Sequence, residues 1–213
     1  MPSIGNISFE NPLLLGPMAG VTDSAFRTIC RQEGAAGSYT EMVSAKALLY
    51  QDKKSRQLLF ISPEDHPCGV QIFGSEPEVC AQAAQLALEI SGADFVDINM
   101  GCPMPKITGN GEGSALMRNI PQAEKLIRAV RQAVQVPLTV KFRKGYEADE
   151  DTCVEFGRMA QACGVDAVCV HGRTRQQMYA GKSDLNAVLR VKEALSIPVI
   201  ASGDMFTPED AQR

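Results

Sequence analysis

FVDINMGCP, residues 95–103, carries the pattern on which the whole chain is built. Apolar and β-branched residues fill its first part, and Gly101, Cys102 and Pro103 end it abruptly. Such an apolar run is typical of a buried strand. Proline stops a strand, and glycine lets the backbone pass close to a ligand. The segment therefore predicts a strand that carries one thiol to the rim of a pocket. The alternative is a small core cysteine at a strand end.

Six further segments repeat this short apolar run, and helical sequence alternates with the runs. The helices are indicated by apolar residues at helical spacing and by glycine stops, as between Glu76 and Gly92. The predicted strands lie in segments 13–20, 38–43, 69–73, 95–99, 138–142, 167–171 and 198–201. The predicted helices lie at 23–34, 44–57, 76–92, 121–134, 151–163 and 185–195, and a last one begins at Thr207.

Short strands that are apolar on both faces and alternate with helices are typical of parallel sheets. A doubly wound sheet and a TIM (β/α)8 barrel both fit this alternation. Polar residues at the C-terminal ends of almost every strand, rather than at one switch point, favour the barrel. These residues are Glu41, Gln71, Asn99, Cys102, Lys141, His171 and the triplet 202–204, with Pro17 and Met18 after the first strand. The predicted fold class is therefore α/β, a TIM (β/α)8 barrel.

Seven predicted strands precede Arg213, whereas a complete barrel has eight strands in about 250 residues. We therefore expect one domain, residues 1–213, that is truncated after the seventh strand and incomplete at its C-terminus.

Composition argues against several classes of protein. The 213 residues carry a formal net charge of −4, which does not indicate a basic nucleic-acid binder. The seven cysteines include no C-x-x-C pair, so we expect no disulfide scaffold, no zinc site and a reducing, cytoplasmic location. No apolar run approaches the roughly 18 residues that a membrane span needs, and the N-terminus lacks a signal-peptide pattern.

The Gln, Asn, Lys and His side chains at the strand ends would form a ring around the cavity, and such a ring does not suit a metal, because it has no carboxylate and no pair of histidines. No nucleophile elbow is present either. Lys141 either extends to the surface or neutralises an anion in the pocket, and His171 is either a core histidine or part of the site. Together with Gln71 and the loop 202–204, these residues suit a flat, polar-edged, phosphate-bearing cofactor such as flavin mononucleotide (FMN).

Five motifs of the sequence resemble those of a known family and occur in the same order. They are PMAGVTD (17–23), QIFG (71–74), DINMGCPMPK with GNG (97–106 and 109–111), KFR (141–143) and HGRT (171–174). The chain resembles the tRNA-dihydrouridine synthases in these motifs, and the bacterial B-type members most of all. The resemblance covers essentially the whole chain.

The resemblance implies an FMN-dependent barrel enzyme that reduces a specific uridine of tRNA to 5,6-dihydrouridine with NADPH. Hydride would pass from the reduced flavin to C6 of the uracil ring, and Cys102 would protonate C5. A thiol suits this role, because it is neutral near pH 7 unless its pKa is depressed. The implied partners are tRNA and NADPH, with no membrane and no metal, and the implied protein is a monomer.

The resemblance also implies roles for individual residues. Asn99 would hold a uracil taken out of its stack, and Arg173 would contact the substrate. Lys141 would favour negative charge on the reduced flavin. The implied cofactor-binding residues are Pro17, Met18, Ala19, Gln71, Lys141, His171, Ser202, Gly203 and Asp204.

Two positions depart from the family pattern. Ser202 stands where an asparagine is usual, which puts one polar contact in doubt, and Leu185 stands where a tryptophan is frequent. The eighth strand and the C-terminal helical domain that grips tRNA are expected to be absent. Two other functions stay open: an inactive or cofactor-poor fragment of such an enzyme, and an FMN barrel that acts on free pyrimidines.

Overall fold

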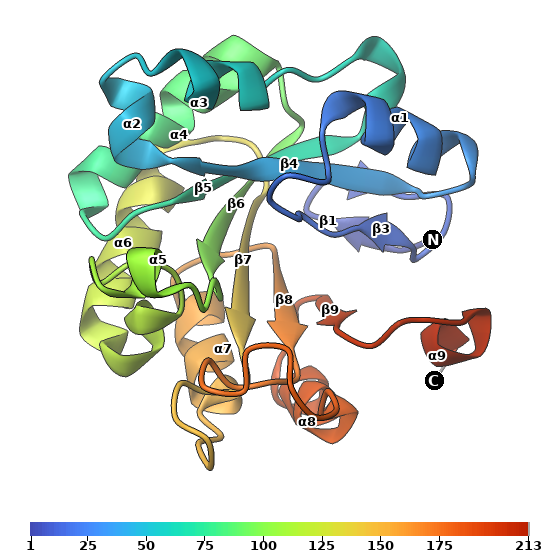
Figure 1. Ribbon diagram of the computed structural model, residues 1–213, viewed down its shortest axis with the longest axis vertical. Coiled ribbons are helices and arrows are strands. Elements are labelled where there is room, and N and C mark those ends of the chain that lie inside the picture. The colour runs from blue at the N-terminus through green and yellow to red at the C-terminus, as the bar shows by residue number, and fades with distance from the viewer. Residues whose placement is uncertain (213) are drawn as a thin grey trace.

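The computed structural model describes residues 1–212 (Figure 1). Its main sheet has seven parallel strands, and their order in space is their order in the chain. A doubly wound sheet reverses its order at a switch point, whereas this sheet never does, and it curls around its own axis. The strands are β3 (Leu14–Leu15), β4 (Gly37–Ser44), β5 (Cys68–Phe73), β6 (Phe95–Met100), β7 (Leu138–Arg143), β8 (Ala167–His171) and β9 (Val199–Ser202). The molecule is therefore an α/β half-barrel, and the predicted seven strands are confirmed.

Helices cover the outer face of this sheet, and their ends carry the expected signals. Asp23 caps α1 by accepting the N–H of Phe26, and Asn119 caps α6 in the same way. Gly92 ends α4 in the left-handed conformation that glycine adopts without strain. The longer helices are α1 (Ser24–Gln32), α4 (Pro77–Ser91), α6 (Ile120–Ala133), α7 (Cys153–Ala162) and α8 (Leu185–Ala194), and the short α9 is Pro208–Gln212.

Three local features differ from the sequence-based prediction. The N-terminus forms a hairpin of β1 (Ser3–Ile4) and β2 (Ile7–Ser8), which was not predicted. The helix predicted at 44–57 is broken into α2 (Ala45–Leu49) and α3 (Lys53–Leu58), because Gln51 adopts a positive φ of 58° and Asp52 caps a new helix. The glycine-rich segment after β6 contains α5 (Pro105–Thr108) and the 3-10 helix η2 (Gly113–Arg118), and a shorter one, η1 (Pro63–Asp65), precedes β5.

Two apolar cores lie on opposite faces of the sheet. The larger packs alternate strand residues, such as Val70, Ile98 and Phe142, against the helices. The smaller closes the inside of the half-barrel with Tyr39, Phe95 and Phe9. Gly69 permits this inner packing, because a Cβ there would lie 2.2 Å from the Phe95 ring. The inner core fills one end of the half-barrel and leaves the other end to polar residues.

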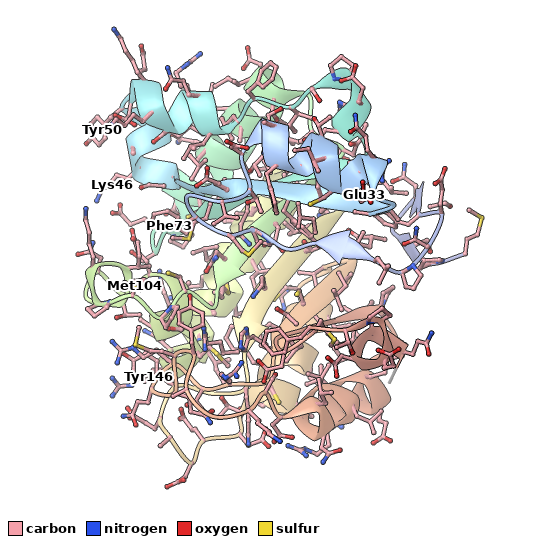
Figure 2. The ribbon with its side chains drawn as sticks, turned by 45° about the vertical axis from the view of Figure 1, so that its right-hand side comes forward. Glu33, Lys46, Tyr50, Phe73, Met104 and Tyr146 are labelled. Carbon is pink, nitrogen blue, oxygen red and sulfur yellow. The ribbon has the colours of Figure 1, made fainter. Side chains whose placement is uncertain are left out.

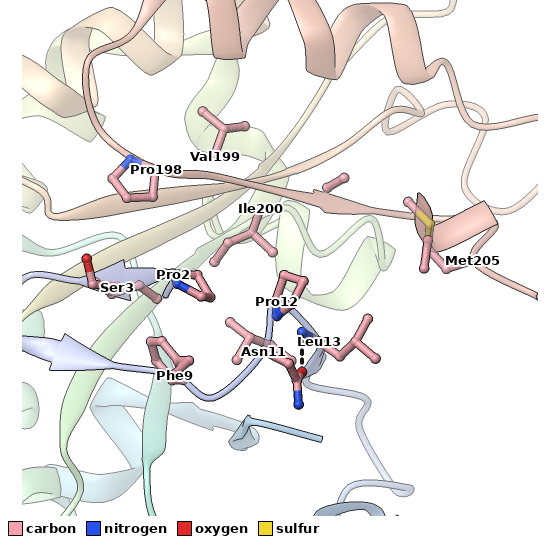
Figure 3. A pocket seen from close by; sticks show the side chains of 14 residues that line it. Pro2, Ser3, Phe9, Asn11, Pro12, Leu13, Pro198, Val199, Ile200 and Met205 are labelled. Carbon is pink, nitrogen blue, oxygen red and sulfur yellow. Dashed lines mark hydrogen bonds between the residues drawn. The ribbon is translucent and has the colours of Figure 1, made fainter. Parts of the chain in front are cut away.

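The sheet is open between its two outermost strands. Among residues 1–212, β3 and β9 pair only on their inner sides, with β4 and β8. An apolar groove of about 370 Å³ separates them, and Phe9, Leu13 and Ile200 line it (Figure 3). No helix in the described part of the chain has the length and apolarity that a membrane crossing requires.

Candidate active site

The polar residues predicted at the strand ends meet on the inner face of the half-barrel, at the C-terminal ends of its strands. Strand register places them in rows: Gln71 pairs with Asp97, Asn99 with Lys141, and Lys141 in turn with Cys169. Paired residues of parallel strands point to the same face, so these side chains form two neighbouring rows on the inner face of the half-barrel. Phe73, Met104 and Tyr146, which end or follow β5, β6 and β7, mark this side of the molecule in Figure 2.

Cys102 lies two residues after the end of β6 and is 9% exposed. Asn99 Oδ1 accepts the backbone N–H groups of Cys102 at 2.8 Å and of Gly101 at 3.1 Å. On the other side, the Cys102 carbonyl accepts the Ser114 hydroxyl at 2.8 Å and the Ser114 N–H at 3.1 Å. Gly113 has a φ of +58°, and a Cβ there would lie 2.9 Å from that carbonyl oxygen. The backbone of Cys102 is therefore fixed from both sides, which holds its Cα at the rim of the site.

A buried chain of side chains leads from Asn99 into the barrel. Asn99 Nδ2 donates to Gln71 Oε1 at 2.9 Å, and Gln71 Nε2 donates to Asp97 Oδ2 at 2.6 Å. The other Asp97 oxygen accepts the Thr139 hydroxyl at 2.5 Å. Burial raises the pKa of Asp97 to about 6, although these two hydrogen bonds and the charge of Lys141 oppose the rise. Sequence reasoning assigned no role to Asp97 or Thr139.

Lys141 and His171 lie beside this chain on β7 and β8. Within residues 1–212 the Lys141 ammonium makes no hydrogen bond or ion pair, although its side chain is half-buried. Burial lowers the pKa of His171 to about 3, with further lowering by the charges of Lys141, Arg143 and Arg173. His171 is therefore neutral at physiological pH. An unpaired cation beside a neutral imidazole leaves the positive charge available to an anionic group.

The loop after β9 packs tightly against His171. Asp204 accepts the Ser183 N–H at 2.7 Å and forms an ion pair with Arg173 at 2.8 Å. Gly203 has a φ of +105°, and a Cβ there would lie 2.8 Å from the Ser183 hydroxyl. The structure thus brings His171, Ser183 and the predicted triplet 202–204 together.

The Arg173 guanidinium is already occupied by its own chain. It donates to the carbonyls of Ala180 and Gly181 and to Asp204, and its Nη1 lies 3.4 Å from His171 Nε2. These contacts make Arg173 a brace between the loop that follows β8 and the loop that follows β9. Its contact with a substrate stays a prediction.

The loop containing Pro17, Met18 and Ala19 follows β3 at the same end of the sheet. Thr22 fixes it, because its hydroxyl accepts the Met18 N–H at 3.0 Å and donates to the Met18 carbonyl at 3.2 Å. Met18 and Ala19 are exposed. This loop forms one rim of the site, on the side where the sheet is open.

Sequence reasoning quoted Arg143 within a motif but gave it no role. Its side chain is buried, and Nε donates to the Gly101 carbonyl at 2.7 Å, directly before Cys102. Its Nη1 donates to the carbonyls of Thr174 and Met178, and its guanidinium lies 5.8 Å from the centre of the Tyr179 ring. The alternation of Lys141 and Arg143 on one strand was the signal, because both then point into the barrel.

Comparison with known proteins identifies a family and several relatives. The family model described as "Dihydrouridine synthase (Dus)" matches residues 14–213. The proteins named tRNA-dihydrouridine synthase B of Vibrio parahaemolyticus and Shewanella oneidensis are each 44% identical over 209 residues, 98% of this chain. The protein of that name from Pseudomonas aeruginosa is 42% identical over 99% of the chain. The chain spans about 65% of the length of the first two relatives and 63% of the third.

Solved structures show the fold alone. A phosphonopyruvate hydrolase matches with a TM-score of 0.64 over 93% of this chain and 71% of its own, at 14% identity. A structure titled as a phosphonomutase of Burkholderia cenocepacia matches with a TM-score of 0.63 over 94% of this chain and 83% of its own, at 18% identity.

Proposed function

This chain belongs to the dihydrouridine synthase family, and on that premise we propose that it forms the catalytic part of an enzyme that reduces uridine in tRNA. The product is 5,6-dihydrouridine, the cofactor is FMN and the reductant is NADPH. One observation supports this most: a single fixed cysteine, Cys102, stands at the rim of a polar ring that contains an unpaired, half-buried cation, Lys141. The relatives are longer than this chain, so the activity of the whole protein is part of the proposal.

The residues of the ring fit FMN. Lys141 offers an uncompensated ammonium to the flavin ring, and Gln71 offers an amide to its polar edge. Gly203, with its positive φ and no side chain, brings the backbone of the loop after β9 close to Ser183 and His171, where it would help to hold the phosphate group. The loop after β3 would cover the flavin from the rim. The proposed cofactor site is therefore Pro17, Met18, Ala19, Gln71, Lys141, His171, Ser202, Gly203 and Asp204.

When bound, FMN reduced by NADPH would supply the hydride that adds to C6 of uracil. Cys102 would donate its thiol proton to C5, which completes the addition across the double bond. The contacts of Asn99, Ser114 and Arg143 hold the backbone of the Cys102 segment still, which would limit the positions of its thiol relative to the bound base. Asn99 and Arg173 are the proposed substrate contacts. Each would contact the substrate and also keep its present hydrogen bonds within the protein.

The remaining expectations belong to the same proposal. The half-barrel would be closed as an eight-stranded barrel, and a helical domain would bind tRNA beside it. The protein would act as a cytoplasmic monomer without a metal. The greater length of the relatives is consistent with an eighth strand and a further domain.

Deleting the gene from its host is the first test. We expect total tRNA from the deletion strain to lose dihydrouridine at one position, as measured by mass spectrometry, and a plasmid copy to restore it. Unchanged dihydrouridine would contradict the proposal. Purified protein that turns over free pyrimidines but leaves tRNA unchanged would favour the other flavin-barrel chemistry.

Replacing Lys141 by methionine should weaken FMN binding. The substitution nearly keeps the length of the side chain and removes the charge, and a hydrogen bond to a charged group is worth about 1.5–3 kcal/mol, or roughly 10- to 150-fold in Kd. Titration of purified apoprotein with FMN, followed by flavin fluorescence, measures this change. Lys125→Met, on α6 away from the ring, should leave the Kd unchanged. Equal Kd values for the two variants would exclude Lys141 from the flavin site.

The open side of the sheet favours a second candidate function. In this candidate the 213 residues by themselves retain little FMN. The groove between β3 and β9 adjoins the loop of Met18, which would cover the flavin. Sheet edges without partners also favour association between copies. The measurement is visible flavin absorbance of the purified 213-residue chain and of the protein isolated from the host. Absorbance in the second sample but not in the first would support this candidate.

A further inference from the structure

The interior of the half-barrel holds one continuous hydrogen-bonded chain that begins at a carboxylate and ends at the backbone of Cys102. Thr139 and Gln71 donate to Asp97, Asn99 donates to Gln71, and the N–H groups of Gly101 and Cys102 donate to Asn99. The links are 2.5 to 3.1 Å long. The four side chains are buried, on β5, β6 and β7. Such a chain has little access to water as an alternative partner.

The side-chain amides of Gln71 and Asn99 in this hydrogen-bonded chain could each be turned by 180°. Such a turn exchanges the oxygen and the NH2 group without changing the shape of the side chain. An ionised carboxylate only accepts hydrogen bonds, so Asp97 requires Gln71 to present its NH2 group. Gln71 then presents its oxygen to Asn99, which must present its own NH2 group in return. Asn99 Oδ1 therefore faces the two N–H groups of the Cys102 segment. A reversed chain would point an NH2 group at those N–H groups and leave all three donors unpaired.

From this geometry we propose that Asp97 is a positioning residue: its carboxylate sets the direction of the Gln71 and Asn99 amides and so fixes the backbone of Cys102. The proposal rests on the proposed function, in which Cys102 is the proton donor. Asp97 does not reach Cys102 itself. Its influence passes through two neutral amides, each with one allowed orientation.

The surroundings of Asp97 keep this arrangement in place. The titratable groups that influence it or respond to it are Lys141 on β7, Tyr39 on β4 and Cys169 on β8. Burial raises the pKa of Cys169 to about 11 and also raises the pKa of Tyr39, so both stay neutral, and Lys141 is the positive charge among them. With its own pKa at about 6, Asp97 is mainly ionised at about pH 7.5, where the directional constraint applies.

Asp97→Asn is the first test, because asparagine keeps the volume but can either accept from or donate to Gln71. The constraint that the carboxylate places on the direction of the chain is then lost, and only the N–H groups of Gly101 and Cys102 still favour the native direction. We expect hydrogen exchange at the Cys102 amide to become about 3- to 10-fold faster, the effect of losing one net hydrogen bond. This readout needs neither FMN nor tRNA, so it separates failure of the inference from failure of the proposed function. In the protein isolated from its host, kcat should fall about tenfold or more with KM for tRNA unchanged.

The double variant Asp97→Asn with Gln71→Glu decides between direction and a merely structural role. The introduced glutamate would again offer only acceptors, so the introduced asparagine and Asn99 must both donate to it. Asn99 Oδ1 then returns to the Cys102 segment, and we expect the exchange rate at Cys102 to return to the wild-type value. Asp94→Asn is the control, since it removes a carboxylate before the same strand, and it should leave exchange at Cys102 unchanged.

Unchanged exchange at Cys102 in Asp97→Asn would overturn the inference. So would fast exchange that the double variant does not restore. If Asp97→Asn fails to fold, the double variant decides alone: wild-type protection supports the directional role, and failure to fold overturns it.

Discussion

Replacing Cys102 by alanine should lower the rate of dihydrouridine formation by about 10²- to 10⁴-fold, the usual contribution of a general acid. The Cys102 thiol is the proposed donor, and hydrogen bonds to the N–H and carbonyl of Cys102 hold its backbone at the rim of the ring. Alanine keeps both backbone contacts and removes only the thiol. FMN binding and the free energy of unfolding should therefore change little.

The measurement is dihydrouridine in total tRNA, by mass spectrometry, from a host strain whose own gene carries the substitution. A time course with purified protein then gives the rate. Cys163→Ala is a matched control, because Cys163 is a buried cysteine at the end of α7, away from the ring. It should leave the rate unchanged. A Cys102→Ala protein as active as this control would contradict the role of Cys102 as proton donor.

Replacing Asp65 by alanine should destabilise the folded chain by about 3–5 kcal/mol, because it leaves a buried charge without its partner. Asp65 and Arg27 have 0% and 1% of their side-chain surface exposed, and their ion pair measures 2.5 Å. Asp65 also accepts the Ser38 hydroxyl at 2.6 Å. Arg27 further donates to the carbonyls of Thr22 and Phe60, so one pair joins α1, β4 and η1.

Urea denaturation followed by circular dichroism measures this loss. Glu76→Gln is the control, since the ion pair of Glu76 with Lys46 is more than half exposed at both side chains and should contribute little. Exchanging both buried partners, Asp65→Leu with Arg27→Met, should recover much of the loss, because no unpaired charge remains. A midpoint for Asp65→Ala equal to that of the control would show that the pair does not stabilise the fold.

The strands could be predicted closely because they are short, apolar on both faces and bounded by glycine or proline. The strand predicted at 167–171 is observed at Ala167–His171, and the other main strands differ by a few residues. The first strand is the exception: only Leu14–Leu15 pair, within an apolar segment predicted as 13–20. The N-terminal hairpin was missed, since Gly5 at its turn packs against Pro137, more than a hundred residues away.

The break at Gln51 had a signal in the sequence. Asp52 and Ser55 have the spacing of a helix cap and its partner, and Asp52 accepts the N–H of Ser55. The helical pattern on both sides concealed it. A local cap signal of this kind competes with a longer periodic pattern, and the pattern alone could not show which would prevail.

For the site, the sequence determined which residues reach the C-terminal ends of the strands, because alternation along a parallel strand fixes the face and the end of each side chain. Cys102, Gln71, Asn99, Lys141 and His171 were identified in this way. The partners of these side chains depend on contacts between strands that lie 26 to 42 residues apart in the sequence. Only the tertiary structure decided that Arg173 braces two loops, that Lys141 has no partner in residues 1–212, and that Asn99 supports Cys102 through a chain beginning at Asp97. Hydrogen bonds are short and directional, so the register and curl of the whole sheet select their partners.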